Sequence, residues 1–234
     1  MIQLVYSPVW FFGKDIIIDI VSVFVLGLVA FTSLRFYRMN KENKKYLYTG
    51  ISFILLALAF AFKILTNFTI YYIAPHTRQV GYVTLTYEAI HSSDILFYIG
   101  FLAFRLLTLF GFYMLYSIYQ ENQSKSTIFI VSFLIIVSTF LGEQAYYLFH
   151  VTALIILIFI TWQYFKNYKE NKHYTTKLLA ISFLVIALSH LLSMFIDFSA
   201  IFYVIAELIQ FVGYMMLLVT FIKVISVGKK KRKN

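Results

Sequence analysis

The residues best suited to chemistry in this sequence are the ionisable ones that lie inside long apolar stretches. A charged side chain at the centre of a bilayer costs at least ~2.5 kcal/mol, so it needs a partner or a ligand. Four such residues lie well inside the stretches: Lys63, Arg105, His190 and Glu207. Three more lie nearer the ends of the stretches: Asp19, His150 and Asp197. We predict that these seven side chains line a polar pocket for a small ligand or an ion.

The composition indicates that helices in a lipid bilayer position these groups. Hydrophobic residues make up 61% of the 234 residues and charged residues 13%, which is too apolar for a water-soluble domain of this size. Lipid offers no hydrogen bonds to the backbone, and a helix satisfies its own backbone groups. A helix crosses a hydrocarbon layer of ~30 Å with roughly 20 residues. We therefore predict an all-α, multi-pass, seven-transmembrane-helix bundle in the cell membrane.

The predicted spans are apolar stretches separated by short polar segments. They are 16–37, 47–73, 95–119, 127–142, 145–165, 177–199 and 201–226, of which the fourth is the shortest. A longer polar segment, 75–94, connects the second and third spans, and we expect it to lie over the pocket as a lid. Asp94, Glu143 and Asp197 are expected at helix ends on the same side as this segment.

The basic residues predict the orientation, because Lys and Arg collect in the short cytoplasmic loops of membrane proteins. With the N-terminus outside and the C-terminus inside, sixteen of the twenty basic residues fall on the cytoplasmic side. They lie in 35–45, at Lys125, in 166–177 and in 223–233, where a basic cytoplasmic tail (227–234) ends the sequence. The formal charge of +10 thus reflects topology, and we predict no nucleic-acid partner.

An internal repeat is visible in the sequence. Lys-Glu-Asn-Lys occurs at 41–44 and 169–172, Ile-Ser-Phe occurs at 51–53 and 181–183, and Gly111 aligns with Gly213. These matches divide the single membrane domain into repeat A (about 15–120), a linking helix (about 127–142) and repeat B (about 145–226). This 3+1+3 arrangement predicts parallel repeats about an axis along the membrane normal.

The repeat places several of the ionisable residues at equivalent positions. Arg105 corresponds to Glu207, Lys63 lies within one turn of the equivalent of His190, and Asp19 lies near the equivalent of His150. One interpretation is a pocket near the repeat axis that opens outward. The other is that Arg105 pairs with Glu207 and Lys63 with Asp19, as interhelical contacts that only fix the helix register.

Three functions fit this pattern. The first is a sensor or receptor-like protein that binds a small ligand, or a partner protein, in the outward pocket and signals to a cytoplasmic output protein. In architecture alone, the bundle resembles the seven-helix sensory modules that prokaryotes fuse to kinases. The second is a small-solute or ion transporter that uses Lys63, Arg105 and Glu207. The third is a membrane-embedded, metal-dependent hydrolase.

Other features argue against specific chemistries. His150 and His190 are the candidate metal ligands, but they match no known ligand spacing, so we predict no metal, no cofactor and no catalytic residues. The sequence has no cysteine, which excludes disulfides and thiolate sites. The last span carries a lysine only near its cytoplasmic end, at Lys223, which does not fit a retinal Schiff base.

Overall fold

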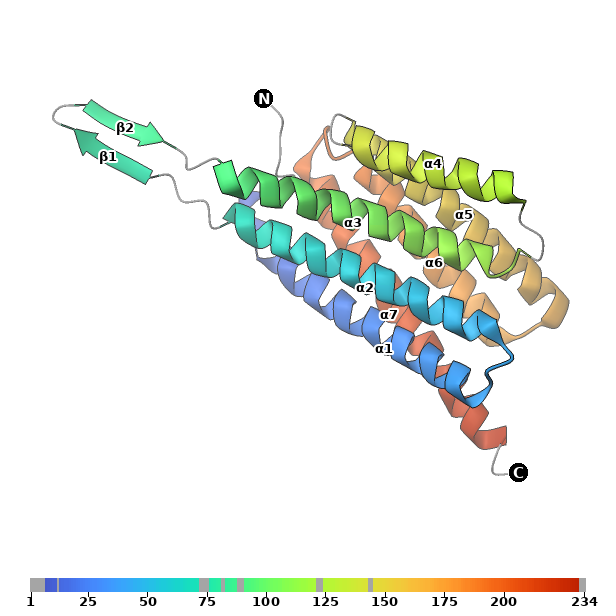
Figure 1. Ribbon diagram of the computed structural model, residues 1–234. Helices are drawn as coiled ribbons and strands as arrows, with labels where there is room; N and C mark the ends of the chain where they lie inside the picture. The colour runs from blue at the N-terminus through green and yellow to red at the C-terminus, as the bar shows by residue number, and fades with distance from the viewer. Residues whose placement is uncertain are drawn as a thin grey trace.

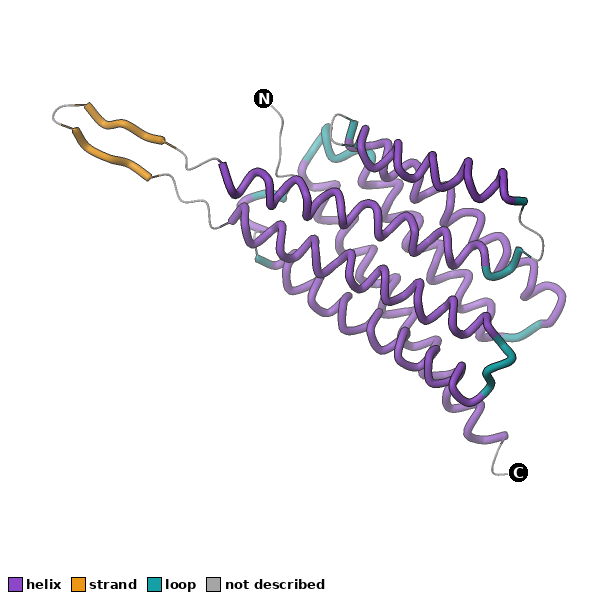
Figure 2. Tube along the Cα trace, in the orientation of Figure 1, coloured by secondary structure: helices purple, strands orange, loops and turns teal. Residues whose placement is uncertain are grey.

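The computed structural model describes residues 7–11, 13–71, 76–80, 83–87, 91–120, 124–142 and 145–231 (Figure 1). In this part of the chain nearly every residue is helical, and Figure 2 shows the helices in purple. The helices are η1 (Val9–Phe11, a 3₁₀ turn), α1 (Lys14–Met39), α2 (Lys44–Tyr71), α3 (His91–Ser117), α4 (Lys125–Leu141), α5 (Tyr146–Asn171), α6 (Tyr174–Ser193) and α7 (Ala200–Lys231). The prediction of a helical membrane protein is confirmed.

Six of the α-helices are long and apolar enough to cross a membrane: α1, α2, α3, α5, α6 and α7. The exception is α4, whose 17 residues span about 25 Å at 1.5 Å per residue. It is mostly apolar, and Figure 1 shows it running alongside α3 and α5. Six membrane-spanning candidates are therefore established, and a seventh crossing by α4 stays a prediction.

The six long helices pack in a closed ring. Each packs against the next in the order α1, α2, α3, α5, α6 and α7, and α7 packs against α1 to close the ring. Helix α4 lies outside this ring, against α3 and α5. As a result, α1 lies across the ring from α5, α2 from α6, and α3 from α7.

Large aromatic side chains fill the middle of the ring. Phe60 of α2 meets Tyr214 of α7 edge to face, with ring centroids 5.3 Å apart, and it also meets Phe104 of α3 at 5.9 Å. Phe104 in turn contacts Phe149 of α5 at 5.7 Å. Such packing holds helices together in lipid, where the hydrophobic effect does not drive their association.

Hydroxyl side chains inside the helices bond to their own backbone. Ser52 and Ser182 donate to the carbonyl oxygens of Tyr48 and Leu178, each four residues earlier, and Thr108 donates to Phe104 in the same way. This arrangement satisfies a buried hydroxyl without a partner helix or water. These serines and threonines are thus part of the apolar framework.

A two-stranded antiparallel hairpin lies between α2 and α3, and the sequence analysis did not predict it. Strand β1 (His76–Val80) pairs with β2 (Val83–Tyr87), and the hairpin extends beyond the end of the bundle (Figure 1). Alternating β-branched residues in the second strand favour this structure. Within the predicted lid, residues 75, 81–82 and 88–90 lie outside the described residues, as does Glu143, whereas residues 91–94 form the first turn of α3.

The basic segments named above gather at one end of the bundle. The ends of α1, α3, α5 and α7 and the starts of α2, α4 and α6 all lie at the end opposite the hairpin (Figure 1). Arg38, Lys44, Lys125, Lys169 and Lys177 are therefore on the same side of the bundle. We call this the basic end and the other the hairpin end.

Candidate functional site

The Lys63 ammonium lies between two carboxylates from different helices. Its Nζ is 3.0 Å from Asp19 Oδ1 of α1 and 2.6 Å from Glu207 Oε1 of α7, and it donates a hydrogen bond to each oxygen. The three side chains join α1, α2 and α7 at the place where the ring closes. We call Asp19, Lys63 and Glu207 the charged cluster.

The charged cluster is buried, and its charges do not balance. Relative exposures are 0% for Asp19, 6% for Lys63 and 7% for Glu207. Asp19 lies five residues into α1, roughly 8 Å from its first residue, so the cluster is within the apolar span and nearer the hairpin end. Two carboxylates and one ammonium sum to −1 when all three are ionised. A buried excess charge is costly, so the cluster favours uptake of one positive charge.

Each carboxylate keeps one oxygen for a further partner. Asp19 Oδ2 and Glu207 Oε2 are buried and have no hydrogen-bond partner within the described part of the chain. A carboxylate has about four acceptor positions, and a buried oxygen that accepts nothing loses its solvation without compensation. These two oxygens are the atoms at which a proton or a cation would bind.

Aromatic rings enclose the lysine side chain. Lys63 Nζ lies 5.6 Å from the ring centre of Phe60 and 5.8 Å from that of Phe104. The rings stabilise the cation through their quadrupoles and exclude water. The ammonium is thus held by charge on one side and by apolar surface on the other.

The short helix η1 packs beside the charged cluster, at the hairpin end. Phe11 is 4% exposed and meets Tyr203 of α7 edge to face at 6.4 Å, and the Tyr203 hydroxyl donates to Asp15 Oδ2 at 3.4 Å. Asp15 is fully buried one helical turn before Asp19, on the same face of α1. The sequence analysis missed Asp15 and Tyr203; the four-residue spacing of two aspartates was the signal for the first of them.

His150 and His190 form a second polar contact, between α5 and α6. Their Nδ1 atoms are 3.0 Å apart, the side chains are buried, and both Nε2 atoms lack a partner among the described residues. Phe149 and Phe112 pack against the His190 ring, with centroids 5.8 and 5.9 Å away. A hydrogen bond between two neutral imidazoles requires one ring to carry its proton on Nδ1 and the other to accept there.

Arg105 lies at the interface of α3 with α4 and α5, apart from Glu207. The guanidinium carbon is 4.6 Å from the ring centre of Phe101 and 5.7 Å from that of Tyr146. Nη1 passes close to Gly142, where an added Cβ would be only 3.0 Å from it. The predicted pairing of Lys63 with Asp19 is present. The predicted pairing of Arg105 with Glu207 is not, because Glu207 pairs with Lys63 instead. The reason is geometric, because α3 and α7 lie on opposite sides of the ring and Lys63 reaches α7 from α2.

The predicted pocket residues thus divide into separate groups. Asp19, Lys63 and Glu207 lie together, His150 and His190 lie together, and Asp197 is exposed in the turn after α6. Among the described residues, no group of three or more His, Cys, Asp or Glu side chains is placed to hold a metal ion. A pocket shared by all seven residues stays a prediction.

Comparisons with protein families, with curated proteins and with solved structures found no match to this chain. The fold and the geometry of the charged cluster therefore carry the functional argument. What they establish is a membrane-embedded helical protein with a buried, charge-unbalanced cluster.

Proposed function

We propose that this protein is an ion-linked membrane transporter, in which Asp19 and Glu207 bind a proton or a small inorganic cation. The observation that carries the proposal is the excess carboxylate around Lys63. Ionisable residues buried at membrane depth are costly and rare, and they mark ion pathways and proton relays in pumps and transporters. A net charge of −1 inside the membrane therefore favours binding of one proton or cation.

The packing of two glycines supports the internal repeat, which a transporter of this kind would use. A Cβ added at Gly111 of α3 would lie 2.9 Å from a Leu56 methyl group and 3.2 Å from the Ser52 carbonyl oxygen of α2. At Gly213 of α7, the equivalent contacts are Ile186 at 2.6 Å and the Ser182 carbonyl oxygen at 3.4 Å, both in α6. The two Ile-Ser-Phe motifs are 130 positions apart. The same offset takes positions 52 and 56, which contact Gly111, to positions 182 and 186, which contact Gly213.

The ring order supports the same symmetry. Helices related by the repeat, α1 with α5, α2 with α6 and α3 with α7, lie across the ring from each other, as a twofold axis along its centre requires. Carriers built from repeats bind their substrate at the interface between the repeats. The charged cluster occupies such an interface, where α7 of repeat B meets α1 and α2 of repeat A.

The two repeat interfaces differ in charge. At the α7–α1 interface, Glu207 adds a carboxylate to Asp19 and Lys63, whereas at the α3–α5 interface its counterpart Arg105 adds a cation beside Tyr146. Repeat B has the pair of His150 and His190 near the positions equivalent to Asp19 and Lys63. This asymmetry favours one cation-binding site per chain.

In the proposed topology, α4 is the seventh crossing and the basic end faces the cytoplasm. The gathering of the basic loops at one end supports this orientation. The charged cluster then lies toward the outer surface, under the N-terminal segment, and its ion enters from outside.

Ion flux in liposomes tests the proposal. Purified protein is reconstituted into liposomes that contain a proton-, sodium- or potassium-sensitive dye, and flux of each ion is measured under its own gradient. Glu207→Gln is expected to reduce flux of the transported ion at least about tenfold. Glu170→Gln, at an exposed position near the basic end, makes the same chemical change and should leave flux unchanged. Equal flux in empty and protein-containing liposomes for every ion would refute transport.

A second candidate is the sensor, which the cover over the charged cluster favours. Phe11, Tyr203 and Asp15 close the hairpin end of the cluster, as expected of a receptor that couples ion binding to movement of its N-terminal segment. Binding of the ion without flux, lost in Glu207→Gln, would identify the sensor. Co-purification of a cytoplasmic output protein would support the same assignment.

A further inference from the structure

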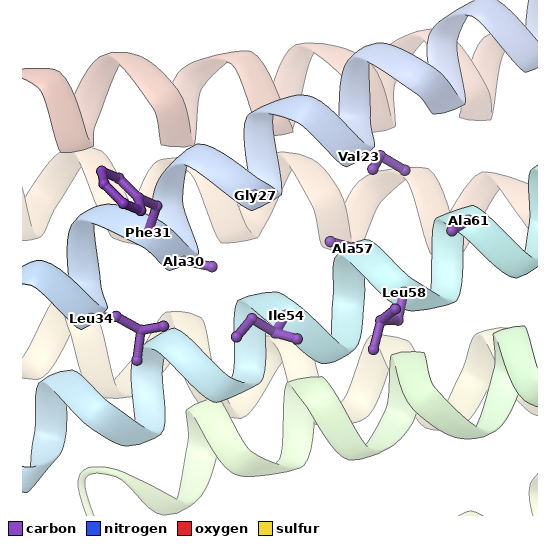
Figure 3. A pocket seen from close by; sticks show the side chains of 9 residues that line it. All are labelled: Val23, Gly27, Ala30, Phe31, Leu34, Ile54, Ala57, Leu58 and Ala61. Carbon is purple, nitrogen blue, oxygen red and sulfur yellow. The ribbon is translucent and has the colours of Figure 1, made fainter.

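An apolar groove runs along the outside of the bundle between α1 and α2 (Figure 3). Its volume is about 350 Å³, and its lining runs from Val23 to Leu34 of α1 and from Ile54 to Ala61 of α2, around the middle of both helices. Small side chains form its floor, because Gly27, Ala30, Ala57 and Ala61 leave space that larger residues would fill. A Cβ added at Gly27 would meet nothing within 4 Å.

Larger apolar side chains form the walls of the groove and face outward. Phe31 of α1 is 63% exposed, and Ile54 and Leu58 of α2 are 38% and 47% exposed. At the basic end Leu34 of α1 packs on Gly50 of α2, where an added Cβ would lie 2.7 Å from the Leu34 side chain. An elongated apolar groove that faces the hydrocarbon fits a flexible hydrocarbon chain.

Positive charge lies just beyond the end of the groove that is nearer the basic end. Arg38 is one turn past Leu34 on the same face of α1, and Lys44 begins α2 at the same end of the bundle. Both side chains are exposed. Each Lys or Arg near a membrane surface attracts anionic lipid.

We propose that this groove binds one anionic phospholipid, with an acyl chain on Gly27 and Ala57 and the phosphate between Arg38 and Lys44. The apolar lining selects a hydrocarbon chain, and the two cations select an anionic headgroup over a zwitterionic one. The site is independent of the charged cluster, which lies on the other side of α1 and α2, toward α7. The lipid would hold α1 and α2 together next to the helices that carry Asp19 and Lys63.

Native mass spectrometry of the purified protein with added phosphatidylglycerol or phosphatidylcholine tests the site. We expect one phosphatidylglycerol to stay bound under conditions that strip phosphatidylcholine. Arg38→Gln with Lys44→Gln should weaken phosphatidylglycerol binding between about fivefold and thirtyfold. Gly27→Leu, which fills the groove, should remove the retained lipid while the protein still folds.

Matched controls separate this site from general attraction of the basic end for lipid. Lys166→Gln with Lys169→Gln removes the same charge at the basic end of α5, and Ile155→Phe adds bulk on a lipid-facing surface of α5. Neither should change lipid retention. Equal loss in the α5 charge variant, or unchanged binding in Gly27→Leu, would overturn the proposal. A dimer that Gly27→Leu dissociates would also overturn it, and would assign the groove to a second copy.

Discussion

Lys63 Nζ lies 2.6 Å from Glu207 Oε1, although 144 residues separate them in the sequence. The contact ties the second helix to the last one and, through Asp19, to the first. It therefore closes the helix ring and at the same time creates the excess negative charge on which the proposed function rests.

Removing the lysine charge should destabilise the protein more than removing all three charges. Lys63→Met leaves two buried carboxylates without a cation, so we expect the free energy of unfolding to fall by about 3 kcal/mol or more. Adding Asp19→Asn and Glu207→Gln to Lys63→Met removes that repulsion and should restore most of the loss. Denaturation in detergent measures both. Additive losses across the three sites would contradict a coupled cluster.

Glu207→Gln alone should leave stability unchanged or raise it. The variant turns a cluster of charge −1 into a neutral pair of Lys63 and Asp19, which removes the buried excess charge. Thermal unfolding of this variant beside Glu170→Gln checks the sign. A fall of several degrees specific to Glu207→Gln would mean that the carboxylate acts as a structural contact and that the excess charge costs little.

The histidine pair should contain two different tautomers. The Nδ1–Nδ1 distance of 3.0 Å requires one ring protonated on Nδ1 and the other on Nε2. Nitrogen NMR on protein with labelled histidine in lipid discs reports the tautomers. The signals can be assigned with His150→Asn and His190→Asn, because the sequence has only five histidines. Two Nε2-protonated rings would show that the contact is not a hydrogen bond.

The repeat predicts matched effects at the two packed glycines. Gly111→Ala and Gly213→Ala force a new methyl group against the neighbouring helix and should each destabilise by about 1–3 kcal/mol. Gly27→Ala has open space around it and should be neutral or slightly stabilising, since alanine favours the helix. Unfolding of the three variants tests this. Tolerance of both packed positions would show that the close contacts relax easily.

Cysteine labelling should place the two ends of α4 on opposite faces of the membrane. The protein has no cysteine, so single substitutions give a clean signal. Ser124→Cys and Lys172→Cys should react from the cytoplasm, and Ser199→Cys and Ala145→Cys from outside. Reaction of positions 124 and 145 from the same face would show that α4 does not cross the membrane. The orientation of α5, α6 and α7 in the membrane would then be the reverse of the predicted one.

The sequence predicted the helices well because their signal is local. Apolar length alone identifies α1 to α3 and α5 to α7, and only α4, at 17 residues, leaves the number of crossings open. The hairpin was missed because its alternation is short and lies in a polar segment. Helix boundaries differ from the predicted spans by several residues, since polar residues continue some helices beyond the apolar part.

The contacts between site residues were harder to predict, because they depend on which face each helix turns inward and on which helices pack together. The repeat alignment placed Arg105 at the position equivalent to Glu207, but the helices that carry these residues, α3 and α7, lie across the ring from each other. Proximity of Lys63 to Asp19 was foreseen, whereas its contact with Glu207 requires knowledge that α7 packs on α1. No sequence period encodes that closure.

Infrared spectroscopy of the reconstituted protein tests the central claim most directly, because a neutral carboxylic acid has its own carbonyl band. In a buffer whose only cation is a large organic one, we predict a protonated-acid band near neutral pH in the wild type. That band should be weaker in Glu207→Gln, whose charged cluster needs no extra charge, and unchanged in Glu170→Gln. A small inorganic cation that binds the cluster should remove it. A wild-type spectrum identical to that of Glu207→Gln in this region, with and without such cations, would show that the cluster takes up no positive charge and would contradict the account.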